Sequence, residues 1–402
     1  MTFDKKEIQK LGKVYDYLRD GHLRSRELGS QRVSIKNVNF TESKFQGTSW
    51  QYFDFVDCEF GGQYSIRLEW LTDSTFTNCR FTGYVMLNHA INVRFLNCVV
   101  NGESLLSFSG KSTNLAFESC TFSNPDYDPN HESGIISHGE VLFINCKAEG
   151  FVLEAYKKLI LRHCTTNPAR LATAPSGLFS DKSKMPYADF LLENCNFTRG
   201  VSMINAKLNS LTMRSCKVGV FKTAGSVVRG DVLVEGIKKG FLRLSASDFQ
   251  GKLTVRDCRF YTTVEGHSFK CNVDTPVYSL IENVQCGKAP VDLICSGGPM
   301  KESDWLPVAS NQSTIIRNCD IPHLHVDWMQ SEHLRIENCH FDTLLIRNGR
   351  IGKLEIIGCR LKKLDVSNTK VQEQDVRVQE GGKISGHITV TTGSNIKLLP
   401  KD

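Results

Sequence analysis

The sequence predicts an all-β protein that folds as a single-stranded parallel β-helix with about 20–21 residues in each coil. Three observations predict this fold: a short motif recurs along the chain, its copies are almost evenly spaced, and a shorter period of five residues runs inside each copy. A spacing of five fits neither the 3.6-residue period of an α-helix nor the two-residue period of one long strand.

The recurring motif is an alternating apolar run that ends on a cysteine and is followed, two residues later, by another apolar side chain. Residues 334–343, "LRIENCHFDT", and residues 190–197, "FLLENCNF", are two copies. Aligned copies place these cysteines in one position: Cys58, Cys79, Cys98, Cys120, Cys146, Cys164, Cys195, Cys216, Cys258, Cys319, Cys339 and Cys359. Val38, Ile237 and Val284 fill the same position in three further copies. Most intervals are then about 20–21 residues long, a period typical of solenoids.

The five-residue period gives the cross-section of each coil. Pairs of small or apolar residues recur five positions apart, as Leu334/Ile336 and Cys339/Phe341 do. A short strand with its corner uses five residues, and four such sides make a coil of 20. Each coil is then expected to pair with the next at about 4.8 Å.

A small residue two places before a bulky apolar one, repeated every five positions, resembles the pentapeptide-repeat proteins over about residues 33–371. The resemblance implies a right-handed quadrilateral β-helix. Leucine often replaces the small residue of the family's usual A-(D/N)-L-x-x pattern, and single-residue slips occur, so the chain resembles a divergent relative. A looser β-helix of the pectate-lyase kind stays open. Because the family includes topoisomerase-protecting proteins and bacterial effectors, the resemblance implies a target-protecting protein or an effector.

The two ends of the chain differ from the repeat. Residues 4–20 are predicted to form an amphipathic helix, because Asp4 and Glu7 have the spacing of a capping box. We expect residues 1–32 to form an N-terminal helical cap over the exposed edge of the first coil, although a helix that binds a partner or acts in targeting stays open. Residues 372–402 lose the five-residue frame and are expected to form an irregular C-terminal cap.

Four long intervals interrupt the β-helix of residues 33–371. They place insertions near residues 123–135, 167–184, 261–275 and 287–308, and all four follow the cysteine-bearing corner. Loops on a rigid scaffold often carry function. We therefore expect the insertions to decorate one face of the β-helix, where a protein partner docks.

The densest group of ionisable residues lies in and just after the first insertion. Asp126, Asp128, His131, Glu132 and His138 are residue types that act in general acid–base chemistry and in metal binding. A solvated polar loop explains the same composition, so no residue is assigned as catalytic. If the protein is an enzyme, these five residues are the candidates, and a polysaccharide lyase or glycoside hydrolase acting between the loop clusters is the alternative function.

Aromatic side chains in or near the insertions are the candidate binding residues. They are Tyr127, Phe179, Tyr187, Tyr261 and Trp305. Exposed Tyr and Trp residues are frequent anchors of protein interfaces. The favoured function is accordingly a non-enzymatic interaction scaffold for a protein partner, with a carbohydrate as the alternative ligand and the oligomeric state left open.

The cysteines are interpreted as packing rather than chemistry. A stack of cysteines in successive coils lacks the clustered ligand spacing of a zinc site, so we expect no metal site and no cofactor. His340 follows Cys339 and should point outward, away from the thiol. Cys271, Cys286 and Cys295 lie off the aligned position, and a metal-binding or redox trio is a minor alternative for them.

Charge and hydropathy limit the function classes. The net charge is +6 and the cysteine count is fifteen, an odd number. A weak positive charge argues against a dense nucleic-acid-binding patch and against DNA mimicry. No apolar run is long enough for a membrane span, and no signal-peptide pattern is present. Free thiols suit a reducing compartment, so we expect a cytoplasmic protein, with export by a signal-independent route left open.

Overall fold

A computed structural model describes the greater part of the repeat. The described residues are 2–3, 32–41, 46–62, 66–83, 85–101, 107–108, 112–123, 134–137, 139–155, 157–172, 186–197, 199–238, 240–260, 269–274, 278–288, 291–294, 313–327, 329–378, 383–385 and 388–390. The chain divides into two compact units, Met1–Phe197 and Thr198–Asp402, and each is described by itself.

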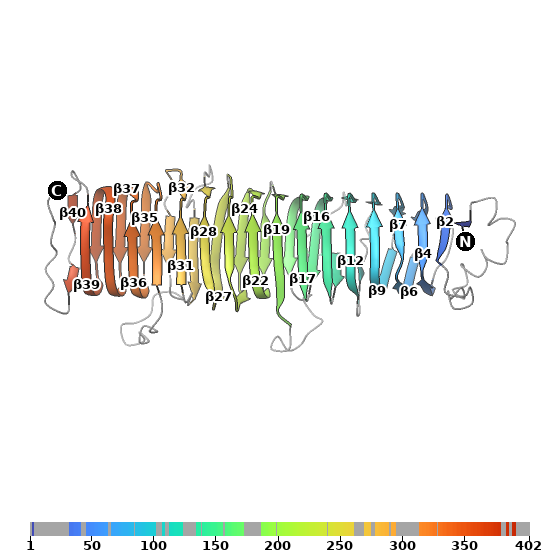
Figure 1. Ribbon diagram of the computed structural model, residues 1–402, viewed down its shortest axis with the longest axis horizontal. Helices are drawn as coiled ribbons and strands as arrows, with labels where there is room; N and C mark the ends of the chain where they lie inside the picture. The colour runs from blue at the N-terminus through green and yellow to red at the C-terminus, as the bar shows by residue number, and fades with distance from the viewer. Residues whose placement is uncertain are drawn as a thin grey trace. The chain divides into compact units, whose positions relative to one another are not determined.

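Each unit is a parallel β-solenoid. Figure 1 shows β2 (Val33–Lys36), β4 (Phe53–Val56) and β7 (Thr75–Thr77) side by side, with their arrowheads pointing the same way. Every strand pairing whose register is described within a unit is parallel, as for β2 with β4 and β4 with β7. The predicted all-β parallel fold is therefore confirmed as a parallel β-solenoid, and no helix occurs among the described residues.

The strands of the first unit are short and follow one another closely. They are β1 (Thr2–Phe3), β2 (Val33–Lys36), β3 (Gln46–Gln51), β4 (Phe53–Val56), β5 (Glu59–Gly61), β6 (Ile66–Thr72), β7 (Thr75–Thr77), β8 (Arg80–Thr82), β9 (Val85–Leu96), β10 (Val99–Asn101), β11 (Ser107–Phe108), β12 (Thr113–Glu118), β13 (Thr121–Ser123), β14 (Gly134–Ser137), β15 (Glu140–Ile144), β16 (Lys147–Ala155), β17 (Lys158–Arg162), β18 (Thr165–Ala172), β19 (Ala188–Glu193) and β20 (Asn196–Phe197).

The second unit continues the same pattern, with longer strands near its C-terminal end. They are β21 (Val201–Ile204), β22 (Lys207–Arg214), β23 (Lys217–Val218), β24 (Val220–Ala224), β25 (Val227–Val228), β26 (Val232–Glu235), β27 (Phe241–Phe249), β28 (Lys252–Arg256), β29 (Arg259–Phe260), β30 (Phe269–Asp274), β31 (Tyr278–Glu282), β32 (Gln285–Cys286), β33 (Val291–Ile294), β34 (Ser313–Arg317), β35 (His323–Asp327), β36 (Gln330–Glu337), β37 (His340–Arg347), β38 (Arg350–Ser367), β39 (Thr369–Val378), β40 (Lys383–Ser385) and β41 (Ile388–Val390).

The strand register agrees with the sequence period. Leu211 of β22 pairs with Val232 of β26, and Leu334 of β36 pairs with Leu354 of β38. At these positions equivalent residues of neighbouring coils are paired directly, whereas the register shifts locally where β3 pairs with β6, β27 with β30 and β38 with β39. One position of the motif consequently forms a continuous row along the axis of the unit, with about 4.8 Å between neighbours.

The corner before each cysteine is made by a residue in the left-handed backbone conformation. The asparagines that directly precede a ladder cysteine have φ angles of 53° to 55°, namely Asn97, Asn145, Asn194, Asn318 and Asn338. Asparagine is enriched in this conformation because its short polar side chain relieves part of the cost that other L-residues meet there. These five residues therefore form the turn that directly precedes the buried cysteine.

The cysteine ladder lies inside the solenoid. Thirteen described cysteines are free and buried. The thiol of Cys339 donates to the carbonyl of Glu337 at 3.2 Å and lies 3.6 Å from the carbonyl of Ile316 in the preceding coil. Ser74 replaces the thiol at an analogous corner, where its hydroxyl donates to the carbonyl of Thr72 at 2.8 Å. The ladder thus packs the interior and satisfies corner carbonyls.

A second internal row is mainly aromatic in the first unit, where Leu161 and Leu192 end it, and aliphatic in the second. Phe76, Phe95, Phe117 and Phe143 stack with centroid distances of 5.0, 4.7 and 4.8 Å and nearly parallel rings. The aliphatic row of the second unit consists of Val234, Val255, Ile281, Ile316, Ile336 and Ile356. Pairing in register places similar apolar side chains directly against one another in successive coils. Each row therefore excludes water along the unit.

The ends and the insertions are described only in part. Thr2 and Phe3 form β1, which pairs with β2, whereas the predicted helix at 4–20 lies outside the described residues. Past residue 372, β40 and β41 pair with β38 and β39, so parallel pairing continues where the side-chain frame is lost. Backbone pairing does not need the five-residue side-chain pattern.

Five strands reach into the ranges assigned to insertions, and two of them, β13 ending at Ser123 and β14 beginning at Gly134, only touch the edges of the range near 123–135. β18 extends to Ala172, β30 covers Phe269–Asp274, and β33 covers Val291–Ile294. The rest of these ranges, and most of the range near 123–135, lies outside the described residues.

Candidate functional site

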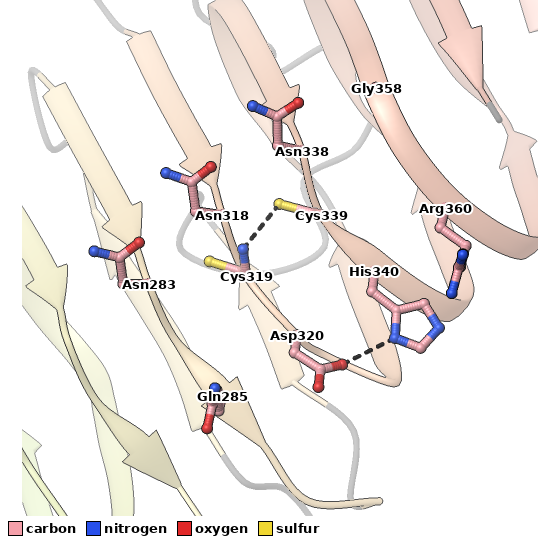
Figure 2. Close-up of a pocket in the computed structure, with 10 residues that line it drawn as sticks. All are labelled: Asn283, Gln285, Asn318, Cys319, Asp320, Asn338, Cys339, His340, Gly358 and Arg360. Atoms are coloured by element: carbon pink, nitrogen blue, oxygen red, sulfur yellow. Dashed lines mark hydrogen bonds and ion pairs between the residues drawn. The ribbon is translucent and has the colours of Figure 1, made fainter.

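An open depression lies on the second unit. It encloses about 690 Å³. Figure 2 shows the residues that line it: Asn283, Gln285, Asn318, Cys319, Asp320, Asn338, Cys339, His340, Gly358 and Arg360. These residues come from four consecutive coils, so the depression follows the axis of the unit.

Backbone geometry at the corner creates this depression. Asn283, Asn318, Asn338 and Gly358 all have positive φ angles, between 52° and 64°. The left-handed corner turns the chain sharply, and a small buried residue follows it. Two positions after each corner residue, a polar side chain points outward because the strand alternates with buried residues.

The outward row in the depression is Gln285, Asp320, His340 and Arg360. Parallel bridges join Gln285 to Asp320 and Asp320 to His340, and His340 pairs with Arg360 in register. Nδ1 of His340 lies 3.0 Å from Oδ1 of Asp320, as Figure 2 shows. His340 therefore points outward, as the sequence predicts.

The Asp320–His340 pair is a weak candidate for proton transfer. The carboxylate orients the imidazole through Nδ1 and leaves Nε2 on the far side of the ring, an arrangement used by general bases. The side chains of Asp320 and His340 are, however, 60% and 45% exposed, so water screens their interaction. This arrangement suits hydrogen bonding to a polar ligand better than activation of a nucleophile.

The two thiols that line the depression are buried, and that of Cys339 is a poor nucleophile. Cys319 and Cys339 are 3% and 2% exposed. The hydrogen bond with Cys319, together with burial, raises the pKa of Cys339 to about 12. A thiol that keeps its proton at neutral pH neither attacks a substrate nor binds a metal readily.

Nearly all of the predicted site residues fall outside the described residues. This holds for the ionisable group Asp126, Asp128, His131, Glu132 and His138, and for the aromatic residues Tyr127, Phe179, Tyr261 and Trp305. Only Tyr187 is described: it is half-buried and lies just before β19. The loop-face assignment therefore stays a prediction.

Two further features of the described residues limit the chemistry. No group of three or more His, Cys, Asp or Glu residues is arranged to hold a metal ion in the described part of the chain. Of the three off-ladder cysteines, Cys286 is buried, and burial raises its pKa to about 12. Nothing is described of the side chains of Cys271 and Cys295. No helix among the described residues is long and apolar enough to cross a membrane.

An outer aliphatic stripe, which sequence reasoning missed, lies on the first unit. It consists of the solvent-side residues Ala116, Leu142, Ile144, Ile160 and Leu191 on β12, β15, β17 and β19, all of them half-buried. Register pairs Ala116 with Leu142, Leu142 with Ile160 and Ile160 with Leu191. The solvent face of a sheet usually carries polar residues, so this stripe is unusual for a surface.

A charge ladder, also missed, runs along the outside of the second unit. It alternates in sign: Arg214, Glu235, Arg256, Glu282, Arg317 and Glu337 pair in register. Glu235 lies 3.0 Å from Arg214 and 2.6 Å from Arg256, and Arg317 lies 2.6 Å from Glu282. Both rows become visible in the sequence once a single motif position is followed from coil to coil.

Comparison with known proteins identifies no relative of this chain. No family model, no curated protein and no solved structure gives a significant match to the sequence. The function proposed for the protein consequently rests on the geometry of the chain itself.

Proposed function

We propose that the protein is a non-enzymatic interaction scaffold whose solenoid presents an outer face to a protein partner. The outer aliphatic stripe is the observation that supports it. Leu142, Ile160 and Leu191 are paired neighbours on adjacent strands and are all half-buried on the solvent side. Aliphatic side chains in such a row gain free energy when a second protein covers them.

The surroundings of the stripe resemble the layout of a protein interface. Ion pairs flank it, between Arg162 and Glu193 at 3.0 Å and between Arg94 and Glu118 at 3.6 Å. Protein interfaces typically combine an apolar centre with a charged rim. A folded partner with an apolar patch and both signs of charge at its edge is the occupant that fits this pattern.

The family relation belongs to the same proposal. Inward residues in pairs, left-handed corners and coils of about 20 residues support a divergent pentapeptide-repeat-like protein with a quadrilateral cross-section. An effector or target-protecting role, in a cytoplasmic setting, would follow from that relation. The predicted insertions would extend the docking face beyond the stripe.

The test is affinity capture with matched variants of the full chain. Leu142→Thr, Ile160→Thr and Leu191→Thr together remove the apolar character of the stripe while keeping a strand-forming residue. Leu233→Thr, Leu280→Thr and Ile315→Thr make the same change at the equivalent positions of the second unit. A protein captured by the native chain and by the control, but lost from the stripe variant, is then purified and mixed with the chain.

Binding of that purified partner to the native chain, weakened at least tenfold by the stripe substitutions, supports the proposal. Equal capture by both variants overturns it. A third variant that lacks residues 124–133 and 173–185 measures what two of the predicted insertions add. Loss of the partner from this variant alone would move the docking face from the stripe to the insertions.

A polysaccharide-processing enzyme remains the second candidate, and the depression on the second unit is what favours it. A carboxylate, an imidazole and a guanidinium from Asp320, His340 and Arg360 line one open groove with several amides. Glycoside hydrolysis ordinarily needs two carboxyl groups, and Asp320 supplies one. Release of reducing ends from glycans, abolished by Asp320→Asn and by alanine at Asp126, Asp128, His131 and Glu132, would favour this candidate.

A further inference from the structure

One stretch of the second unit carries a local excess of positive charge. Residues 215–260 contain nine Lys and Arg residues and four Asp and Glu residues, so they contribute +5 to a net charge of +6. A weak net charge over the whole chain is therefore compatible with a local excess of cations.

The basic side chains of this segment form two rows, here called the basic rows. The first row is Lys217, Lys238 and Arg259, and the second is Lys222 and Arg243. Each residue of the first row directly follows the buried residue at the cysteine position of the motif. A parallel bridge joins Lys238 to Arg259. Lys222 pairs with Arg243 in register.

Lys217 belongs to the same register as Lys238. The pairs on either side of it, Arg214 with Glu235 and Val220 with Phe241, have the same offset along the chain. The three cations of the first row therefore follow one another at about 4.8 Å per coil. All three are exposed.

No acidic partner neutralises these rows within the described structure. None of the five cations makes an ion pair with a described residue, whereas the charge ladder on the same coils alternates in sign. Two of the nearby carboxylates are engaged elsewhere: Glu235 by Arg214 and Arg256, and Asp257 by the amide of Asn283 at 2.9 Å.

Stacked like charges oppose folding. Two unit charges about 4 Å apart in water repel by roughly 1 kcal/mol, and an in-register solenoid repeats that cost at each step. The charge ladder demonstrates that a row of this solenoid can alternate in sign. The basic rows keep a repulsion that an anionic ligand would relieve.

We propose that the basic rows bind an extended acidic segment of the partner protein. This inference rests on the proposed scaffold function and names the chemistry of a second contact. An extended chain presents alternate side chains on one side at a spacing of about 7 Å, so flexible Lys and Arg side chains on consecutive coils can reach successive carboxylates. Surface complementarity of this kind speeds association and selects partners.

A protein segment fits the basic rows better than a nucleic acid does. Proteins that bind single strands combine basic grooves with aromatic side chains on which bases stack. The large hydrophobic side chain that is exposed among the described residues is Trp70, in the first unit. The coils of the basic rows offer their cations without such a stacking surface in the described part of the chain.

The experiment measures binding of a defined probe to the purified full chain. The probe is a fluorescent peptide in which Glu alternates with Ser, and its affinity is measured by anisotropy at several salt concentrations. The peptide with Gln in place of Glu is the uncharged control. A single-stranded oligonucleotide of matched charge represents the nucleic-acid class.

Two variants carry the same change in net charge. Lys238→Glu with Arg259→Glu alters the first basic row, whereas Arg80→Glu with Lys147→Glu alters exposed cations at the same motif position in the first unit. We expect the row variant to lose about tenfold or more in affinity, the control to lose little, and binding to weaken as salt rises.

Equal losses in both variants would show a response to net charge alone and would overturn the proposal. So would binding of the Gln peptide as tight as that of the Glu peptide, or a preference for the oligonucleotide. The stripe variant separates this result from the proposed function: unchanged partner binding by that variant overturns the stripe, whereas probe binding tests the basic rows alone.

Discussion

Arg256 donates to Glu235 across two neighbouring strands, with 2.6 Å between Nη2 and Oε1. Arg214 approaches the other carboxylate oxygen at 3.0 Å from the opposite side. One carboxylate thus compensates two cations from the coils before and after it. The strand register brings the three side chains together, because the same motif position in the preceding and following coils lies next to Glu235.

Reversing this charge should destabilise the second unit. In Glu235→Lys, three cations would lie in successive coils, and we expect the free energy of unfolding to fall by about 1–2 kcal/mol at low salt. Urea denaturation monitored by circular dichroism measures it. Glu332→Lys is the control, since Glu332 makes no ion pair with any described residue. Equal shifts of the two midpoints would argue against the charge ladder as the cause.

The thiol at a ladder position should be replaceable by a hydroxyl. Cys339→Ser keeps a donor for the carbonyl of Glu337, as Thr369 does for the carbonyl of Ser367 at 3.0 Å. We expect a loss of no more than about 1 kcal/mol. Cys339→Phe should cost about 1–3 kcal/mol through overpacking. A serine variant as unstable as the phenylalanine variant would mean that sulfur itself is required.

Alkaline pH should weaken the folded state. Burial raises the pKa of Cys258 and of Cys286 to about 12, against about 8.5 in an unfolded chain. Above that lower value the unfolded chain releases protons that the folded chain keeps, so stability falls as pH rises, by about 1.4 kcal/mol per pH unit for each such thiol. Below it the thiols contribute no pH dependence.

Denaturation midpoints measured between neutral pH and the alkaline range check this prediction. Cys258→Ser with Cys286→Ser should flatten the decline, because a hydroxyl does not ionise there. Alkylation followed by mass spectrometry gives a second readout, in which both thiols react only after unfolding. Rapid alkylation of Cys258 in the folded chain would contradict its burial.

The corner residue Asn338 should prefer glycine to alanine as a replacement. Its φ is 53°, a conformation that costs residues with a Cβ about 1–2 kcal/mol. Asn338→Gly is therefore expected to be close to neutral, whereas Asn338→Ala loses about 1 kcal/mol. Thermal unfolding of both variants gives the comparison, and an alanine variant as stable as the glycine variant would exclude strain at this corner.

The fold could be predicted because its signal is repeated many times. Cys339 alone resembles a ligand or a nucleophile, but its copies fix the period, and the period fixes which residues point inward. Leu334 and Leu354 pair as the spacing requires. The corner asparagines Asn318 and Asn338 hold a fixed place in the same frame, directly before the buried cysteine.

The surface features could not be read in the same way. When each coil is considered alone, Leu142 or Ile160 is an ordinary residue at a variable position, and Lys238 is one charge among many. Their meaning depends on what lies directly across in the next coil, which is a property of register rather than of local sequence. The sequence instead points to the densest group of ionisable residues, from Asp126 to Glu132. These residues lie outside the described part of the chain, so their role stays a prediction.

Because the charge ladder alternates in sign, it matters whether an odd or an even number of coils is removed from the second unit. Excision of the single coil that carries Glu235 would bring Arg214 against Arg256, while excision of two consecutive coils would restore opposite neighbours. A solenoid is usually regarded as free to lose or gain coils one at a time. Along this row, length changes in steps of two coils are the ones that leave no like charges in contact.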